Sequence, residues 1–373
     1  MPQYSKKIRI AVLFGGRSGE HEVSLVSATS VIKNLDKEKY EVIPIGITKQ
    51  GKWIAGPESM KLLKSGQAPS ESNALIPPEP TDLTTSTNDA VKGLGQIDVV
   101  FPVLHGPYGE DGTVQGFLEL TGLAYIGCGT LASSVCMDKV IMKKVLQAEG
   151  LPQVEFVWFW SKEWVSGQEK IITNIENELK YPVFVKPPNM GSSVGISKAK
   201  DRGELIESIK EAIQYDRKII IEQGVENVRE LECSVLGNRN PKVSVVGEII
   251  PSNEFYDYDA KYVDGKSEAK IPAELPKETA KKIQDLAIMA YKALNCEGMA
   301  RADFLLAKDN KLYINELNTI PGFTSISMYP KLWEASGVSY QQILDELIQL
   351  AIERNKEKQE LKIEYTPKED WYN

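Results

Sequence analysis

The sequence is poor in histidine and cysteine, two residue types that commonly hold transition metals. Only two of its 373 residues are histidine, and the four cysteines, Cys128, Cys136, Cys233 and Cys296, lack the spacing of a zinc site. Scattered cysteines are typical of reduced thiols that pack as small apolar side chains, which argues against a disulfide framework. We therefore expect neither a zinc centre nor a disulfide-bonded secreted scaffold.

Long apolar runs and an excess of positive charge are also missing. No stretch approaches the roughly 18 apolar residues of a membrane span, and no charged-then-apolar leader precedes the first expected strand. The chain carries 44 Lys and Arg against 52 Asp and Glu, a formal net charge of -8. Because binding to a phosphate backbone requires a basic face, this balance argues against nucleic acid as the main partner. We expect a cytoplasmic globular protein without membrane contact.

The length and the hydrophobic pattern divide the chain into more than one unit. A chain of 373 residues exceeds one ordinary core. Up to about residue 130, apolar runs alternate with helical patterns, as in a parallel α/β domain, and the Pro-, Ser- and Thr-rich stretch 69–88 is typical of an exposed excursion. The following residues to about 228, and those from about 230 to 354, mix strands and helices in α+β fashion, and a frayed charged tail is expected beyond.

Residues 300–318 predict a hairpin with charged residues at one end. Two apolar runs flank the pair Asp309-Asn310, and such pairs favour a two-residue turn. That turn places Asp303 opposite Glu316 and Arg301 opposite Asn318. Side chains alternate along a strand, so Asp303, Glu316, Arg301 and Asn318 all lie on one face of the sheet.

Two carboxylates that face each other repel, and an oxygen-binding dication between them would reverse that repulsion. Asp303, Glu316 and the amide oxygen of Asn318 are the hard ligands that magnesium prefers beside nucleotide phosphates. The alternative is a solvated hairpin end with scattered charge. Apolar residues on both faces of the two strands indicate a buried sheet and favour the metal site.

Two glycine-rich loops are candidates for ligand binding. In residues 186–195 the glycines and serines allow backbone amides to approach a polyphosphate, and Lys186 supplies a point charge. This loop is not a Walker A motif, because its lysine precedes the glycines; an ordinary turn is the alternative. Residues 105–116 follow an expected strand, where α/β folds place ligands. His105 there has either a substrate contact or a structural role, whereas His21 is expected to be structural.

In this order the segments resemble the D-alanine:D-alanine ligases of the ATP-grasp superfamily, over roughly residues 8–355. The most specific match is residues 105–116, which read His-Gly-Pro-Tyr-Gly-Glu-Asp-Gly-Thr-Val-Gln-Gly. The second is the pair of segments 301–303 and 315–322, which read Arg-Ala-Asp and Asn-Glu-Leu-Asn-Thr-Ile-Pro-Gly.

The resemblance implies a three-domain fold of α/β and α+β units that enclose ATP. Residues 1–132 would form the substrate domain, 133–228 the central subdomain with the glycine-rich loop, and 229–373 the subdomain with the metal site and a closing loop. The implied reaction joins two D-alanines through a D-alanyl phosphate, releases ADP and phosphate, and serves peptidoglycan synthesis. It uses ATP and Mg²⁺, with two ions expected and Mn²⁺ as a substitute, and the family implies a homodimer.

The resemblance also implies which residues bind the nucleotide and the metal. Lys139 and Lys186 would hold the phosphates, and Ser193 would lie in the loop that covers them. Contacts with adenine are implied for Glu222, Gly224 and Val225. Glu230 would bind the ribose, and Lys261 of the closing loop would reach the phosphates. The magnesium ligands of the family correspond to the hairpin residues Asp303, Glu316 and Asn318.

Substrate and catalytic roles follow in the same way. Glu20 would bind the ammonium of the first D-alanine with His105 nearby, while Ser327 and the backbone of Met328 would bind the carboxylate of the second. Arg301 and the amide of Gly322 would stabilise the acyl phosphate and the tetrahedral oxyanion. In the loop 254–262, Tyr262 would hydrogen-bond toward Glu20 and Ser192 as the loop closes and excludes water.

Three alternatives remain open at this point. A depsipeptide ligase that uses D-lactate would lack the tyrosine arrangement around Tyr262. A nucleotide-binding relative without turnover would have lost a metal ligand or Arg301, and none is lost here. Another ligase or carboxylase of the superfamily would lack the segment 105–116 and the loop 254–262.

Overall fold

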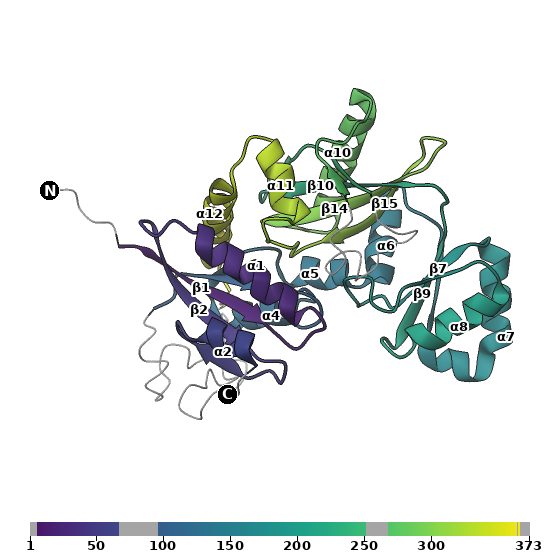
Figure 1. Ribbon diagram of the computed structural model, residues 1–373, viewed down its shortest axis with the longest axis horizontal. Coiled ribbons are helices and arrows are strands. Elements are labelled where there is room, and N and C mark those ends of the chain that lie inside the picture. Colours follow the sequence, from purple (N-terminus) through teal and green to yellow (C-terminus); the bar gives the residue numbers. More distant parts are fainter. Residues whose placement is uncertain (1–5, 67–95, 251–267, 364, 366–373) are drawn as a thin grey trace.

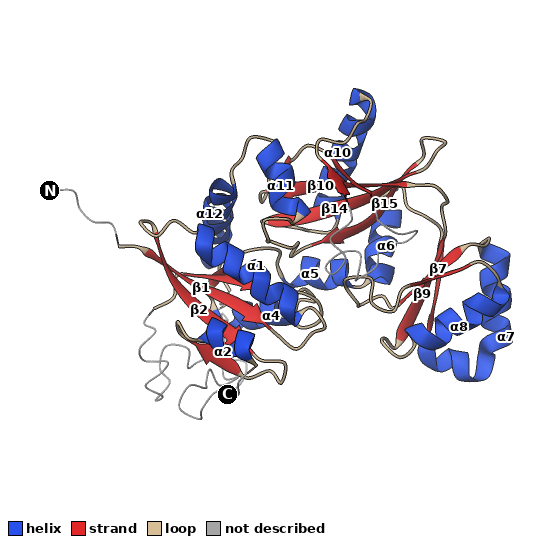
Figure 2. Ribbon diagram, in the orientation of Figure 1, coloured by secondary structure: helices blue, strands red, loops and turns tan. Residues whose placement is uncertain are grey.

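The computed structural model describes residues 6–66, 96–250, 268–363 and 365, which form three sheets with their covering helices (Figures 1 and 2). The stretch 69–88 and the loop 254–262 with Lys261 and Tyr262 lie outside the described residues. Among the helices that are described, none has the length and apolar character needed to cross a membrane.

The amino-terminal sheet has the order β3-β2-β1-β4-β5. Its strands β1 (Ile8–Gly15), β2 (Tyr40–Ile47), β4 (Val99–Val103) and β5 (Ala124–Tyr125) are parallel, and β3 (Trp53–Ala55) is an antiparallel edge. Beside it lie α1 (His21–Asn34), α2 (Ser59–Ser65) and α4 (Thr113–Thr121). The next helix, α5 (Thr130–Met137), packs Ala132 and Cys136 into the core of the carboxy-terminal sheet described below. The parallel pattern expected from the apolar runs is confirmed. The loops that carry Glu20 and His105 follow the carboxyl ends of β1 and β4.

The central sheet is antiparallel, in the order β6-β9-β7-β8. Its strands are β6 (Phe156–Trp160), β7 (Val183–Lys186), β8 (Ser197–Ala199) and β9 (Lys218–Gln223). One face packs its aliphatic side chains against α7 (Ser161–Glu178) and α8 (Arg202–Ala212). Figure 1 shows both helices on the same side of β7 and β9. Because side chains alternate, Lys186 and Glu222 project from the opposite face, which approaches α6 (Lys139–Ala148).

The carboxy-terminal sheet has the order β13-β12-β10-β14-β15, with β11 paired to β10. The strands are β10 (Arg229–Leu236), β11 (Lys242–Val243), β12 (Gly247–Ile250), β13 (Glu268–Lys270), β14 (Met299–Leu306) and β15 (Leu312–Asn318). Its apolar face packs against α10 (Lys277–Ala293). The chain continues with α11 (Met328–Ala335) and α12 (Tyr340–Gln359). The expectation that the chain frays after residue 354 was wrong for residues 355–359, because α12 continues to Gln359.

The β14–β15 hairpin differs from the expected one at its turn. Ala307 N donates to Lys311 O at 2.9 Å, and Asn310 adopts a left-handed φ of 63°. The loop therefore has three residues, 308–310, and the two-residue turn was wrong. Near the loop Phe304 pairs with Ile314, a register that would not bring Asp303 opposite Glu316.

A β-bulge at Asn315 restores the expected pairing at the far end of the hairpin. The register shifts between Asp303 and Phe304, so that Asp303 does face Glu316 and Arg301 does face Asn318. The buried positions follow the same shift, from Leu312 and Ile314 to Leu317. An extra residue is needed to keep all three in the core, and it turns Glu316 and Asn318 to the same face as Asp303.

The loop geometry predicts different outcomes for two substitutions at Asn310. Asn310→Val should lower the free energy of unfolding by about 1–2 kcal/mol, because a β-branched residue is strained at positive φ. Asn310→Gly, the control, should leave it unchanged or slightly higher. Thermal unfolding of both variants measures the difference, and equal losses would contradict the left-handed turn.

Candidate active site

Three carboxylates form a row across the carboxy-terminal sheet. Glu232 on β10 pairs with Asp303 on β14, which pairs with Glu316 on β15. Arg301 donates from Nε to Asp303 Oδ1 at 2.7 Å and from Nη2 to Oδ2 at 2.6 Å, and its Nε also lies 3.1 Å from Glu232 Oε2. Lys139 Nζ lies 3.3 Å from Glu316 Oε2. The two cations offset the repulsion within the row.

Glu232 was missed from the sequence. Its signal was present, because the polar Glu230, Glu232 and Ser234 alternate with the apolar Leu231, Cys233 and Val235 along β10. That alternation shows which residues share a face, but it does not show which strand lies alongside. The pairing of β10 with β14 is what brings Glu232 to Arg301.

The donor set fits a metal that is shared with phosphate groups. Asp303, Glu316 and Asn318 offer oxygen atoms on one face, and Asn318 Oδ1 also accepts from Ile320 N at 3.0 Å. Within the described residues no group of three His, Cys, Asp or Glu side chains is arranged to hold a metal by itself. Magnesium beside nucleotides commonly uses one or two protein carboxylates and takes its other ligands from phosphates and water. The residues present match that kind of site.

The two lysines expected to hold phosphates are both engaged near this row. Lys139 begins α6, whose amino terminus is capped by Asp138, and its Nζ donates to Met190 O of the glycine-rich loop at 3.1 Å. Lys186 Nζ donates to Glu222 Oε2 at 2.6 Å. Burial acts to raise the pKa of Glu222, but the charges of Lys143 and Lys186 outweigh it and lower the pKa to about 2. Glu222 is therefore ionised and holds Lys186.

The glycine-rich loop reaches the amino-terminal domain through Ser192. Its hydroxyl donates to the carboxylate of Glu20, which is buried just before α1. A Cβ on Gly191 or Gly106 would lie 2.6 or 2.7 Å from Glu20 Oε2. Glycine is therefore required on both sides of this carboxylate. Ser192 and Ser193 both have positive φ, of 49° and 61°.

His105 and Glu110 form a buried pair beside Glu20. His105 Nδ1 lies 3.3 Å from Glu110 Oε1 and 3.1 Å from Ile320 O, and Nε2 lies 3.1 Å from Ser27 Oγ. Burial raises the pKa of Glu110 to about 7, against the opposing effect of His105. The structure thus gives His105 a hydrogen-bonding role that joins three parts of the chain. Glu110 was not singled out from the sequence, although it lies within the segment 105–116.

The other expected site residues lie in two groups. Gly224 and Val225 follow β9, where Gly224 N donates to Pro182 O at 2.9 Å, and Glu230 lies on β10. Ser327 is the residue just before α11, and its Oγ accepts from Thr324 N at 3.0 Å. Gly322 and Met328 lie close to Ser327. A Cβ added to Gly322 would lie 2.9 Å from Ser327 Oγ, and Met328, the next residue along the chain, is buried.

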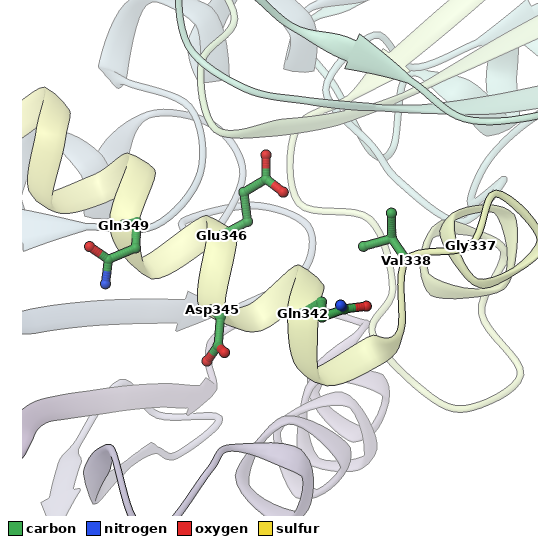
Figure 3. A pocket seen from close by; sticks show the side chains of 6 residues that line it. All are labelled: Gly337, Val338, Gln342, Asp345, Glu346 and Gln349. Carbon is green, nitrogen blue, oxygen red and sulfur yellow. The ribbon is translucent and has the colours of Figure 1, made fainter.

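A hollow of about 470 Å³ lies elsewhere, along α12 (Figure 3). Its lining includes Asp345, which accepts from Lys39 Nζ at 2.6 Å and from Tyr40 Oη at 2.7 Å. Glu346 in the same lining pairs with Lys242 at 2.8 Å. These carboxylates join α12 to β2 and β11, so the hollow belongs to a structural contact and not to the active site.

Comparison with known proteins gives one consistent family. Residues 9–128 match the sequence model described as D-ala D-ala ligase N-terminus, and residues 145–349 match the one described as D-ala D-ala ligase C-terminus. The chain is 55% identical over 358 residues to the D-alanine--D-alanine ligase of Caldicellulosiruptor bescii, covering 95% of this chain and 98% of that protein. It is 52% identical to the ligase of the same name from Natranaerobius thermophilus, covering 95% and 97% of the two chains.

Solved structures agree with this result. The VanG D-Ala:D-Ser ligase from Enterococcus faecalis superposes with a TM-score of 0.81 at 38% identity, covering 93% of this chain and 100% of that one. The D-alanine-D-alanine ligase from Coxiella burnetii gives a TM-score of 0.78 at 37% identity, covering 95% and 97%.

The raised pKa of Glu110 predicts that stability falls as the pH rises. A carboxyl group whose folded-state pKa is about 7, against an ordinary value of 4.5, binds its proton more tightly when folded. Its contribution is full below about pH 4.5 and is lost as the pH rises through about 7, amounting to at most about 3 kcal/mol. Glu110→Gln should therefore flatten the fall in Tm between pH 5 and pH 8, as measured by calorimetry. The exposed Glu58→Gln should not, and a slope unchanged by Glu110→Gln would contradict the assignment.

Proposed function

We propose how this chain, which belongs to the D-alanine--D-alanine ligase family, holds and joins its substrates. It is an ATP-dependent ligase that joins two D-alanines for peptidoglycan precursor synthesis, and the ATP-grasp fold expected from its sequence is confirmed. The observation that carries the proposal is the facing pair Asp303 and Glu316 with Arg301 beside it.

In this proposal the nucleotide lies against the face of the central sheet that carries Lys186 and Glu222. Lys139 and Lys186 neutralise the phosphates, and the loop with Ser193 covers them. The adenine and ribose contacts come from the end of β9 and the start of β10, namely Glu222, Gly224, Val225 and Glu230. Support comes from the contacts of the two lysines, since Lys139 donates to Met190 O of the glycine-rich loop and Lys186, where that loop begins, donates to Glu222.

Asp303, Glu316 and Asn318 would hold magnesium, with two ions in the proposal and manganese as a substitute. When bound, the metal neutralises charge on the terminal phosphates of ATP. The protein also supplies a positive charge to each of the two carboxylates, since Arg301 contacts Asp303 and Lys139 contacts Glu316.

The first D-alanine binds with its ammonium on Glu20, which Ser192 holds. Its carboxylate oxygen attacks the γ-phosphorus of ATP, and the bond from that phosphorus to ADP breaks to give D-alanyl phosphate. The free amine of the second D-alanine attacks the carbonyl carbon and expels phosphate. Arg301 and the amide of Gly322 stabilise the oxyanion, since a planar guanidinium suits paired oxygens.

The second D-alanine is held at its carboxylate by Ser327 and the backbone of Met328. Lys261 and Tyr262 lie outside the described residues. In our proposal they belong to the loop that covers the site, where Lys261 contacts the nucleotide and Tyr262 hydrogen-bonds toward Glu20 and Ser192. We further propose domain boundaries after residues 132 and 228, a homodimer and a cytoplasmic location, which the family resemblance alone supports.

Substrate choice is tested by phosphate release and product analysis. With ATP and magnesium we expect turnover with D-alanine alone and none with L-alanine. Mixtures of D-alanine with D-lactate or D-serine should yield D-alanyl-D-alanine as the main product. A dominant depsipeptide would favour the D-lactate alternative, and a dominant D-alanyl-D-serine would assign the second site to serine.

The metal assignment predicts the effect of neutral substitutions in the hairpin. Asp303→Asn and Glu316→Gln should each lower turnover by about 100-fold or more, because metal-based charge stabilisation contributes several kcal/mol. Both should weaken Mn²⁺ binding in the presence of ADP, measured by electron paramagnetic resonance.

The matched control is Asp309→Asn, which removes an exposed acid from the loop of the same hairpin. It should keep turnover and Mn²⁺ affinity. Circular dichroism checks that all three variants fold, and normal Mn²⁺ affinity in Asp303→Asn and Glu316→Gln would refute the assignment.

A further inference from the structure

Lys143 is a buried cation that the site described above does not use. It lies one helical turn after Lys139 on α6, so both project from the same side of the helix. Its side chain has 0% exposure, and its Nζ lies 3.2 Å from Glu222 Oε1. In the part of the chain that the structure describes, this Nζ has no hydrogen-bond partner of normal geometry, so its contact with Glu222 is an ion pair.

Such a position is costly for a lysine. Burial of an ammonium costs free energy even when one carboxylate pairs with it, and burial lowers the pKa of Lys143 while Glu222 acts in the opposite direction. An apolar residue of similar length would fill the same space without that cost. The charge of Lys143 therefore needs an explanation beyond packing.

The two carboxylate oxygens of Glu222 contact two different lysines. Oε1 contacts Lys143 and Oε2 accepts from Lys186 at 2.6 Å. With Lys186 as its partner at one oxygen alone, the carboxylate would be free to rotate about its terminal bond. A second cation on Oε1 removes that freedom and keeps Oε2 directed at Lys186.

We propose that Lys143 is a positioning residue for nucleotide binding, acting through Glu222 on Lys186. This inference rests on the proposed role of Lys186 as a phosphate ligand. The charges around Lys143 come from both sheets, since Lys186 repels it while Glu222 and Glu316 attract it. Lys143 thus lies between the central sheet and β15, where α6 also passes in Figure 1.

The test is the affinity for ADP with magnesium, measured by isothermal titration calorimetry. Lys143→Met should raise the Kd about tenfold, the usual loss when a supporting partner of a ligand-binding residue is removed. The KM for D-alanine should change less than twofold. Lys143→Arg, which keeps the charge, should recover most of the affinity.

Lys144→Met is the matched control. Lys144 is the next residue on α6, is exposed, and lies over Trp158 with its Nζ 4.3 Å from the ring centroid. Its removal subtracts the same charge and should leave the Kd for ADP unchanged. An equal loss in both variants would mean that net charge, not positioning, is responsible, and would overturn the proposal.

A double-mutant cycle separates action through Glu222 from direct attraction of phosphate. If Lys143 acts through Glu222, then Lys143→Met should add less than twofold to the loss already seen in Glu222→Gln. Losses that multiply in the double variant would overturn the proposal. If Lys143→Met does not fold, as judged by its Tm, Lys143→Gln takes its place in the cycle.

Lys186→Met distinguishes failure of this inference from failure of the proposed function. If Lys186→Met binds ADP normally, the phosphate role of Lys186 is wrong. If Lys186→Met loses affinity while Lys143→Met and Lys143→Gln keep it, the role of Lys186 stands and the positioning role of Lys143 is wrong.

Discussion

The constraint on which the site depends is the repulsion among carboxylates held on neighbouring strands. Glu232, Asp303 and Glu316 are brought side by side by sheet pairing, a fixed geometry that does not allow them to separate. Arg301 lies between two of them and Lys139 reaches the third from α6. Cations are therefore needed to offset this repulsion at neutral pH, and one of them, Lys139, comes from a helix and not from the sheet itself.

Polar contacts also connect elements that belong to different sheets or to the loops that follow them. Lys139 links α6 to β15, Ser192 links the glycine-rich loop to Glu20, and His105 reaches the carbonyl of Ile320. Each contact pairs groups that are far apart in the sequence, and each is at least partly buried. In a low dielectric such contacts are strong when satisfied and costly when broken, so they fix the relative position of the groups that meet the substrates.

Side-chain alternation made the facing pair predictable, but not by the route expected. The turn at Asp309 and Asn310 gave the right pairing of Asp303 and Glu316 because a wrong loop length and an unforeseen bulge cancelled. The bulge had a signal in the change of apolar phase between Ile314 and Leu317. Lys143 had none, because a lysine on a helix is usually exposed and no local pattern shows that Glu222 of a distant strand packs over it.

The charges of the site also limit which ligands it can hold. Four cations, Lys139, Lys143, Lys186 and Arg301, face four carboxylates, Glu222, Glu232, Asp303 and Glu316. A polyphosphate alone would draw the lysines from their partners and leave carboxylates unpaired. A dication alone would draw the carboxylates and leave cationic side chains unpaired. A ligand that brings both charges can satisfy the two sets at once. Because an unpaired buried charge is so costly, this balance favours the complex of nucleotide and metal over either component alone.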